Sequence, residues 1–393
     1  MKILHLADLH IGKLLNGYSL LGEQEKVLKQ VLSVIDEKKA EVVVISGDIY
    51  DRSIPPKEAM LLYNQFLRKV LIDRNIPVLA ISGNHDSAER LEAGNALMEQ
   101  VHYYVEGIFK KETKRVTIED DDGEVDFYLI PFADVAQVRA LLEDDEIRSF
   151  DDAMKKTVEH IVLRKGIRSV VLAHCYAVSE SEEHEEEKID SQKPLSIGGK
   201  EFVDAKCFDK FDYTALGHLH RRQKVGTDKV HYPGTLLKYS FSEEKHQKVI
   251  LLVDLKGDGS VVMEEVPVEL EKNVRTIEGR FEDIMEQALE DLHREDFVRF
   301  ILEDEDMVPD AMGRLKQYYP NAMELRYVFR EKEISQILSK TADRKHTVSE
   351  MAELFYQENY EEEMSVALKE EVSEILKELG CCLTCKVIKK GFA

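Results

Sequence analysis

The chain contains 393 residues, of which 43% are hydrophobic and 33% are charged. No apolar run approaches the roughly 20 residues that a membrane-spanning helix needs, and residues 1–8 lack the apolar stretch of a signal peptide. The five cysteines are unevenly spaced and suggest no disulfide framework. The composition therefore predicts a globular, cytoplasmic protein with no membrane partner and with room for two or three domains.

The formal net charge of −23 also bears on function. A protein that only coats nucleic acid usually presents a basic face, so such an acidic chain is a poor candidate for that class. A nuclease is not excluded, because divalent cations bound at its active site would reverse the sign of the local charge.

Strand-like and helix-like segments alternate along the first part of the chain. The β-branched run from Val42 to Ile45 predicts a buried strand, and the apolar residues at helical spacing before it predict a helix. In chain order, we expect a helix over 23–40, a strand over 42–45, a helix beginning at Pro55-Pro56, and strands over 77–81, 169–173, 213–216, 248–255 and 261–268. This alternation predicts an α/β core of packed sheets with helices outside them.

The last third of the chain has a different pattern. It predicts a small α+β domain with strands over 275–280, 297–302 and 322–329 and helices over 281–292 and 309–319. Two amphipathic helices follow, one beginning at Thr347 with a capping-box pattern to Glu350 and one over 361–379 that stops at Gly380. Acidic runs at 119–124 and 180–187 predict solvated loops.

Polar clusters follow five of the apolar strands. They are Asp8-Leu9-His10, Gly47-Asp48, Gly83-Asn84-His85-Asp86, His174 and Gly217-His218-Leu219-His220. Side chains just beyond the carboxyl ends of strands in an α/β sheet converge in one crevice. Residues two apart in an extended strand point to the same side, so each Asp-x-His or His-x-His pair is expected to enter that crevice. Carboxylate, amide and imidazole groups are ligands of divalent cations, so the pattern predicts a metal site.

Each cluster taken alone also has an ordinary structural explanation. A single histidine after a strand is more often a residue of the core, and an aspartate after glycine is usually a turn residue. Because five clusters occur in this order, each at a strand end, the metal site is the better interpretation of the set.

This ordered set of motifs resembles that of the calcineurin-like metallophosphoesterases over about residues 1–250. Within that superfamily the sequence is similar to the SbcD family of bacterial DNA double-strand-break repair nucleases, through segments 2–12, 47–51, 196–199 and 232–242. The resemblance implies an α/β fold in which a two-sheet metallophosphoesterase sandwich is flanked by helices. By this resemblance the domains would be a nuclease domain over 1–270, an α+β DNA-capping domain over 271–332 and a helical, ATPase-binding tail over 333–393.

The resemblance also implies roles for the clustered residues. Two divalent metal ions, expected to be Mn²⁺, would be bound, the first by Asp8, His10 and His220 and the second by Asn84, His174 and His218, with Asp48 shared between them. His85 would act as a general acid or transition-state donor. Asp86 would either orient His85 through a hydrogen bond or cap a helix.

The implied activity is that of a two-metal DNA nuclease, a 3′–5′ exonuclease on duplexes and an endonuclease on single strands and hairpins. It would act in DNA repair and recombination with an SbcC-type coiled-coil ATPase, bound by the C-terminal helices, and as a homodimer. A small-molecule phosphodiesterase or phosphoprotein phosphatase on the same scaffold is the alternative enzyme. A catalytically silent scaffold is the alternative from another class.

Several residues have two interpretations that the sequence leaves open. His5 is expected to be a core or supporting histidine rather than a ligand. Asp51 stands where archaeal and eukaryotic relatives carry a histidine, which puts that histidine's auxiliary role in doubt here. Four basic residues are either candidate phosphate contacts or ordinary surface residues: Lys13, Arg52, Arg221 and Arg222. Cys382 and Cys385 have the spacing of half a zinc knuckle but are otherwise plain cysteines.

Overall fold

The computed structural model describes residues 1–179, 202–328, 356, 364–365, 368–369 and 371–372. The chain divides into two compact units, one of Met1–Thr276 with Glu295–Phe297 and one of Ile277–Arg294 with Val298–Ala393. The acidic run at 180–187, most of the two predicted C-terminal helices and the Cys382/Cys385 pair lie outside the described residues. None of the described helices is long and apolar enough to cross a membrane.

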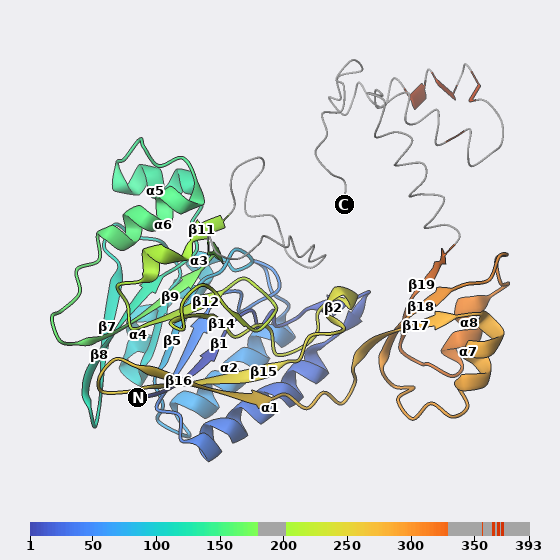
Figure 1. Cartoon of the computed structure of the whole chain (residues 1–393), viewed down its shortest axis with the longest axis horizontal. Helices are drawn as coiled ribbons and strands as arrows, with labels where there is room; N and C mark the ends of the chain where they lie inside the picture. The colour runs from blue at the N-terminus through green and yellow to red at the C-terminus, as the bar shows by residue number, and fades with distance from the viewer. Residues whose placement is uncertain (180–201, 329–355, 357–363, 366–367, 370, 373–393) are drawn as a thin grey trace. The chain divides into compact units, whose positions relative to one another are not determined.

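Two six-stranded sheets form the first unit (Figure 1). The first sheet has the order β16 (Val261–Pro267), β15 (Val249–Leu255), β1 (Lys2–Leu6), β4 (Val42–Ser46), β5 (Val78–Ile81) and β6 (Tyr103–Glu106). The second has the order β13 (Gln223–Lys224), β14 (Val230–Tyr232), β12 (Tyr213–Gly217), β9 (Arg168–His174), β8 (Gly123–Ile130) and β7 (Lys114–Asp120). Strands β1, β4 and β5 are parallel to one another, as are β8, β9 and β12.

The two sheets pack face to face through alternate residues of their central strands. Val42 and Val44 of β4 contribute to this core from one sheet, and Val170 and Leu172 of β9 contribute from the other. Val43 and Ile45 point to the opposite face and are also fully buried, because helices cover that face. This double burial explains why β4 is a continuous β-branched run.

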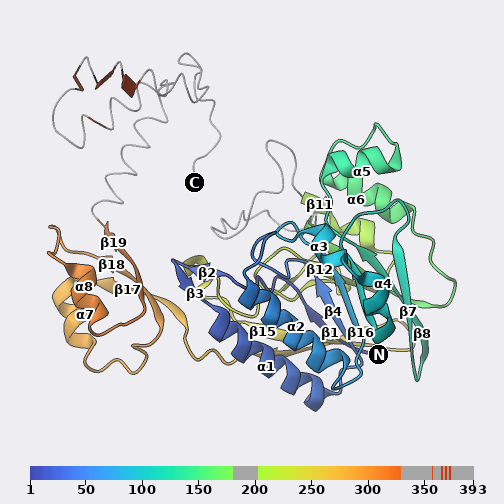
Figure 2. The same ribbon diagram turned by 180° about the vertical axis from the view of Figure 1, so that it is seen from behind.

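Helices cover the outer face of each sheet. The helices α1 (Leu21–Lys38) and α2 (Lys57–Leu71) lie on the first sheet (Figure 2). The helices α5 (Val135–Leu142) and α6 (Phe150–Glu159) share a second apolar core with the outer residues of β8, β9 and β12. The predicted two-sheet sandwich with flanking helices is therefore confirmed.

Short elements complete the first unit. They are β2 (Leu14–Leu15), β3 (Tyr18–Ser19), α3 (Ala88–Glu92), α4 (Asn95–Met98), β10 (Tyr176–Val178), β11 (Phe202–Asp204) and the 3-10 turns η1 (Glu99–Val101), η2 (Ala205–Phe208) and η3 (Phe241–Glu243).

The α+β segment that begins near residue 274 is a three-stranded sheet with two short helices. Its strands are β17 (Val274–Gly279), β18 (Phe297–Leu302) and β19 (Ala322–Tyr327), and its helices are α7 (Phe281–Gln287) and α8 (Ala311–Lys316). The predicted helix over 281–292 is too long, since α7 ends at Gln287. The side chains of Leu289 and Leu292 are 67% and 93% exposed, so no core contact holds a further helical turn there.

The acidic run at 119–124 is not the solvated loop that its composition predicts. Strand β7 continues to Asp120 and β8 begins at Gly123, so the run forms the tip of a hairpin. The carboxylate of Asp120 is buried and accepts hydrogen bonds from the Arg168 guanidinium, and the Met1 ammonium lies 2.7 Å from it. Burial alone would raise the pKa of Asp120, but these cations hold it well below its usual range.

We predict that Asp120→Asn lowers the free energy of unfolding by about 3–5 kcal/mol at pH 7, because it leaves a buried cation without its counter-charge. A carboxylate with a lowered pKa stabilises the fold above its unfolded-state pKa of about 3.9, and this stabilisation fades as the pH falls below that value. Urea unfolding should therefore show a constant difference between variant and wild type from pH 7 to 5 that narrows below about pH 4.

Asp121→Asn is the matched control for this experiment, since Asp121 is exposed at the same hairpin tip. It should change the free energy of unfolding by less than about 0.5 kcal/mol. Equal losses for the two variants would contradict the role given to the Asp120 ion pair.

Candidate metal centre

The predicted site residues lie at the carboxyl ends of strands from both sheets. In the first sheet, Asp8 and His10 follow β1, Asp48 follows β4, and Asn84, His85 and Asp86 follow β5. In the second sheet, His174 ends β9, and His218 and His220 follow β12. Because the strands within each set are parallel, their carboxyl ends lie at one edge, and the two edges meet.

Hydrogen bonds join the two sheets directly beneath these side chains. His174 donates from Nδ1 to the carbonyl oxygen of Ser46 at 2.9 Å, and the Ser46 hydroxyl donates to the Ala215 carbonyl at 2.9 Å. His5 is fully buried in the same layer, where its ring is hydrogen-bonded to Tyr213 at 2.8 Å. His5 is therefore a core histidine, as expected.

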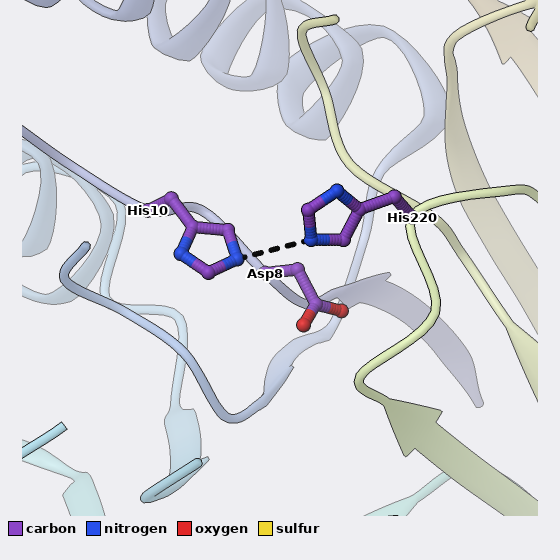
Figure 3. Close-up of side chains that lie close together, drawn as sticks. All are labelled: Asp8, His10 and His220. Carbon is purple, nitrogen blue, oxygen red and sulfur yellow. Dashed lines mark hydrogen bonds between the residues drawn. The ribbon is translucent and has the colours of Figure 1, made fainter. Parts of the chain in front are cut away.

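Three groups of side chains in this region bring their ligand atoms close enough to hold a metal ion. They are Asp8, His10 and His220 (Figure 3), Asp8, Asp48 and His174, and His10, Asp51 and His85. The Nε2 atoms of His10 and His220 face each other at 3.2 Å. Asp48 lies between the first two groups, since its Oδ2 is 3.7 Å from His10 Nε2 and 3.5 Å from His174 Nε2.

In two of the imidazoles the nitrogen that points away from the centre forms a hydrogen bond within the protein. These bonds determine which nitrogen of each ring faces the centre. The Nδ1 of His174 donates to the Ser46 carbonyl, and the Nδ1 of His220 donates to the Glu243 carboxylate at 3.0 Å. In each ring the Nε2 lone pair is therefore directed inward. Such partners on the outer nitrogen are usual for metal-binding histidines.

Burial sets the charge of the centre. It lowers the pKa of His174 to about 4 and holds the pKa of His10 and His218 well below the usual value, so these rings are neutral at neutral pH. Burial and the charge of Asp48 together raise the pKa of Asp8. Buried carboxylates that repel one another, beside neutral imidazole lone pairs, form a donor set that fits divalent cations.

The structure also brings Asn84 and His218 to this centre. The Asn84 side-chain oxygen lies 3.0 Å from His174 Nε2, and the rings of His174 and His218 are 5.4 Å apart. His85 also borders the centre, with its ring 4.8 Å from that of His10 and its Nε2 4.0 Å from Asp48 Oδ2. All of the residues predicted to be ligands therefore surround one region.

The contacts expected for Asp86 are wrong. Its carboxylate accepts hydrogen bonds from the backbone N–H groups of Gly83, Ile49 and Tyr50, at 2.9, 3.1 and 3.0 Å. Among the described residues no hydrogen bond joins it to the ring of His85, which instead donates from Nδ1 to the Asp51 carbonyl at 2.8 Å. The residue that caps α3 is Ser87. Asp86 thus ties the loop after β5 to the loop after β4.

The geometric reason given for the Asp-x-His pair is also wrong. Asp8 and His10 do meet at one site, but not through strand alternation, because both have left-handed backbone conformations with φ of 52° and 41°. Asp48 and His218 also have positive φ, 50° and 110°. Such conformations are strained for residues other than glycine and concentrate at functional sites.

Sequence reasoning missed two buried residues near His220, Glu243 and Lys248. Glu243 is fully buried, and besides His220 it contacts the Lys248 ammonium at 2.6 Å and the Thr235 hydroxyl at 3.2 Å. Burial alone would raise the pKa of Glu243, but Lys248 and His220 lower it to about 2, so its carboxylate is ionised. The only sequence signal for this network is that Thr235 and neighbouring residues belong to the segment that resembles the SbcD family.

The basic candidates for phosphate contact differ in where they point. The Arg222 guanidinium contacts Glu265 at 2.8 Å and the carbonyl of Gln223 at 2.8 Å, which makes it part of the scaffold. Lys13 pairs with Asp51 at 2.8 Å, and Asp51 itself lies 3.9 Å from His10. Lys13 is therefore placed beside the centre, with its charge partly neutralised.

Comparisons with known proteins agree with this geometry. The family model described as calcineurin-like phosphoesterase matches residues 1–222, and the model described as Type 5 capsule protein repressor C-terminal domain matches residues 271–360. The chain is 35% identical over 327 residues to the SbcD subunit of the nuclease SbcCD from Staphylococcus saprophyticus, covering 83% of this chain and 84% of that protein. This chain belongs to the SbcD family of calcineurin-like phosphoesterases.

Solved structures are more distant from this SbcD-family chain. The TT1561 protein of Thermus thermophilus is 11% identical, with a TM-score of 0.39, and the alignment covers 67% of this chain and 98% of that one. Yfce, a phosphoesterase from E. coli, is 14% identical, with a TM-score of 0.26, and the alignment covers 68% of this chain and 100% of that one.

Family membership and the donor set together make the SbcD-family chain a metal-dependent hydrolase with nuclease function.

We predict that Glu243→Ala weakens binding of Mn²⁺ by about 10- to 100-fold, the usual loss when a partner of a ligand histidine is removed. The physical reason is that the His220 ring loses the acceptor that fixes its orientation. Isothermal titration calorimetry on protein stripped of metal with chelator would measure the change.

Lys248→Met is the control, because it breaks the same buried ion pair but leaves the Glu243 carboxylate to orient His220. We expect it to lower the free energy of unfolding while changing Mn²⁺ affinity by less than about threefold, since Lys248 does not itself orient a ligand ring. Equal losses of affinity in both variants would show that the network acts only through stability.

Proposed function

We propose that this chain is a manganese-dependent DNA nuclease, with 3′–5′ exonuclease activity on duplexes and endonuclease activity on single strands and hairpins. The observation that carries the proposal is the meeting of the Asp8 and Asp48 carboxylates with neutral imidazoles at one edge of the sandwich. The mixed nitrogen and oxygen donors accept Mn²⁺ among other divalent ions. The similarity to the nuclease component from Staphylococcus saprophyticus supports DNA as the substrate.

We assign Asp8, His10 and His220 to one cation and Asn84, His174 and His218 to the other, with Asp48 shared. The position of Asp48 supports this division, because one of its oxygens is about equally far from His10 and His174, at 3.7 and 3.5 Å. When bound, the two cations neutralise charge on the phosphoryl oxygens and activate the attacking water.

His85 supplies the proton in this proposal. Its Nδ1–H is held by the Asp51 carbonyl, so Nε2 faces the centre, 4.0 Å from Asp48 Oδ2. The ring is only 5% exposed. A proton carried on Nε2 can be donated to the leaving oxygen as the phosphodiester bond breaks. Asp86 keeps the loop that carries His85 in place through its bonds to backbone N–H groups.

We predict that His85→Gln lowers the rate of DNA cleavage by about 10²- to 10⁴-fold, the usual contribution of a general acid. Manganese affinity should stay close to that of the wild type, because His85 is not one of the proposed ligands. Gel assays on linear, hairpin and single-stranded DNA with manganese, magnesium or chelator would measure the rates. His102→Gln, at an exposed histidine, should cleave normally; full activity of His85→Gln would remove His85 from the mechanism.

We further propose that the chain acts with an SbcC-type coiled-coil ATPase, which is bound by the C-terminal segment over 333–393. The chain forms a homodimer in this proposal. Its domain over 271–332 caps the DNA. The relative from Staphylococcus saprophyticus is named as one subunit of the nuclease SbcCD, which supports a partner chain. The match of a second family model to residues 271–360 supports a role for this region beyond the catalytic sandwich. Apolar residues at helical spacing in the segment fit recognition through an amphipathic helix.

We predict that replacing Leu368 and Val372 with glutamate abolishes co-purification with the ATPase, because charges on the apolar face prevent its burial. The manganese-dependent cleavage of single-stranded DNA by the isolated chain should remain. Lys369→Ala, one residue away on the sequence, serves as the control and should still co-purify. Retention of the ATPase by the double variant would overturn this assignment.

A further inference from the structure

The ring of His10 differs from those of His174 and His220 in the contact of its outer nitrogen. Each of those two rings donates from Nδ1 to an oxygen of the protein. In His10 the Nε2 faces His220, so Nδ1 is the nitrogen directed away from the centre (Figure 3). The ring is fully buried, and within the part of the chain that the structure describes its Nδ1 has no hydrogen-bond partner. A buried N–H without an acceptor costs about 1–3 kcal/mol, so an acceptor is expected close by.

The carboxylate of Asp51 lies beside this nitrogen. Its Oδ1 is 3.9 Å from His10 Nδ1, and only 11% of the Asp51 side chain is exposed. A shift of about 1 Å would bring the two atoms to hydrogen-bond distance. The loops that carry the two residues are joined by backbone hydrogen bonds, from Asp51 N to the Ile11 carbonyl at 3.3 Å and from Ile11 N to the Ile49 carbonyl at 2.9 Å. The carboxylate is therefore held close to the ring.

His10, Asp51 and His85 bring ligand atoms close together, but a third cation is a poor explanation of this group. The Lys13 ammonium lies 2.8 Å from Asp51 Oδ1, where it would repel a metal ion. His10 would also have to bind two cations through its two nitrogens, and a neutral imidazole has only one lone pair to offer. The group is better explained as a contact between a carboxylate and the outer nitrogen of a ligand ring.

We propose that Asp51 is a positioning residue of the metal centre, whose carboxylate accepts the Nδ1–H of His10 and so directs the Nε2 lone pair toward the bound cation. This inference rests on the metal ligands proposed above. A neutral imidazole carries one proton, and placing it on Nδ1 leaves Nε2 free to bind. A carboxylate on the outer nitrogen also fixes the orientation of the ring and makes the inner nitrogen a stronger ligand. Lys13 balances the charge of Asp51 in this arrangement.

The first test is binding of Mn²⁺ to the full chain, stripped of metal with chelator and measured by calorimetry. We expect Asp51→Ala to weaken one of two binding events by about 10- to 100-fold. Asp51→Asn loses the charge but keeps an oxygen that can accept the proton, so it should bind within about threefold of the wild type. Equal losses in the two variants would overturn the proposal, because the charge of Asp51 would then be what matters.

Lys13→Met is the matched control for this test. It removes the cation that pairs with Asp51 but leaves the carboxylate beside His10. We expect it not to weaken the binding of Mn²⁺, because no proposed ligand loses its acceptor. A loss as large as that of Asp51→Ala would overturn the proposal, since Asp51 would then act through Lys13.

A second measurement observes the His10 ring itself. With Zn²⁺ in place of Mn²⁺ and ¹⁵N-labelled histidine, NMR should show a His10 Nδ1–H proton that exchanges slowly with water, assigned by its absence in His10→Gln. We expect this signal in the wild type and in Asp51→Asn, and its loss through faster exchange in Asp51→Ala. A role of Asp51 in stability alone would leave the signal in place, so an unchanged signal in Asp51→Ala would overturn the proposal.

A chain with His10→Ala shows whether Asp51 acts through this ring. It should keep only the binding event of the other cation, and adding Asp51→Ala should not weaken that event further. A further loss would overturn the positioning role. If the wild type does not bind two Mn²⁺ ions, the metal centre proposed above fails. If it binds them and cleaves DNA, but Asp51→Ala binds both as tightly as the wild type, the positioning role of Asp51 fails alone.

Discussion

The metal centre depends on one contact between the sheets, where the end of β4 meets the ends of β9 and β12. The Ser46 carbonyl accepts the Nδ1–H of His174, and a side chain at Gly217 could not be accommodated there, since its Cβ would lie 1.8 Å from the same carbonyl oxygen. Gly217 is required for this close approach of the two backbones. Without it, the proposed ligands from the second sheet could not reach those from the first.

A second constraint is the local backbone conformation at Asp8, His10 and Asp48, which directs these proposed ligands toward the centre. Asp8, His10 and Asp48 have left-handed conformations, each of which costs about 1–3 kcal/mol for a residue other than glycine. Backbone hydrogen bonds hold these turns, for example from His10 N to the Asp48 carbonyl and from Asp8 N to the Gly47 carbonyl, both 3.0 Å. The loops after β1 and β4 therefore stabilise each other. The rigid sheets on which they lie hold the strained backbone conformations in place.

Much of this arrangement follows from the sequence. Buried β-branched runs such as Val42–Ile45 locate the strands, and the polar residues after them locate the site, because parallel strands direct their carboxyl ends to one edge. The conformations at Asp8 and His10 could not be predicted, since they depend on contacts with the next loop. Glu243, Lys248 and Asp120 resemble ordinary surface residues in the sequence, and only the tertiary fold shows which charge each one faces.

The partners on the outer nitrogens of His174 and His220 have a consequence for exchange of the cations. Because the hydrogen bonds to the Ser46 carbonyl and the Glu243 carboxylate fix the orientation of these rings, binding an ion requires little ordering of the protein. A folded chain can therefore release one divalent ion and take up another without rebuilding the site. Which ion is bound in a cell then follows the supply of each metal and its intrinsic preference for nitrogen and oxygen ligands, more than any restriction of shape.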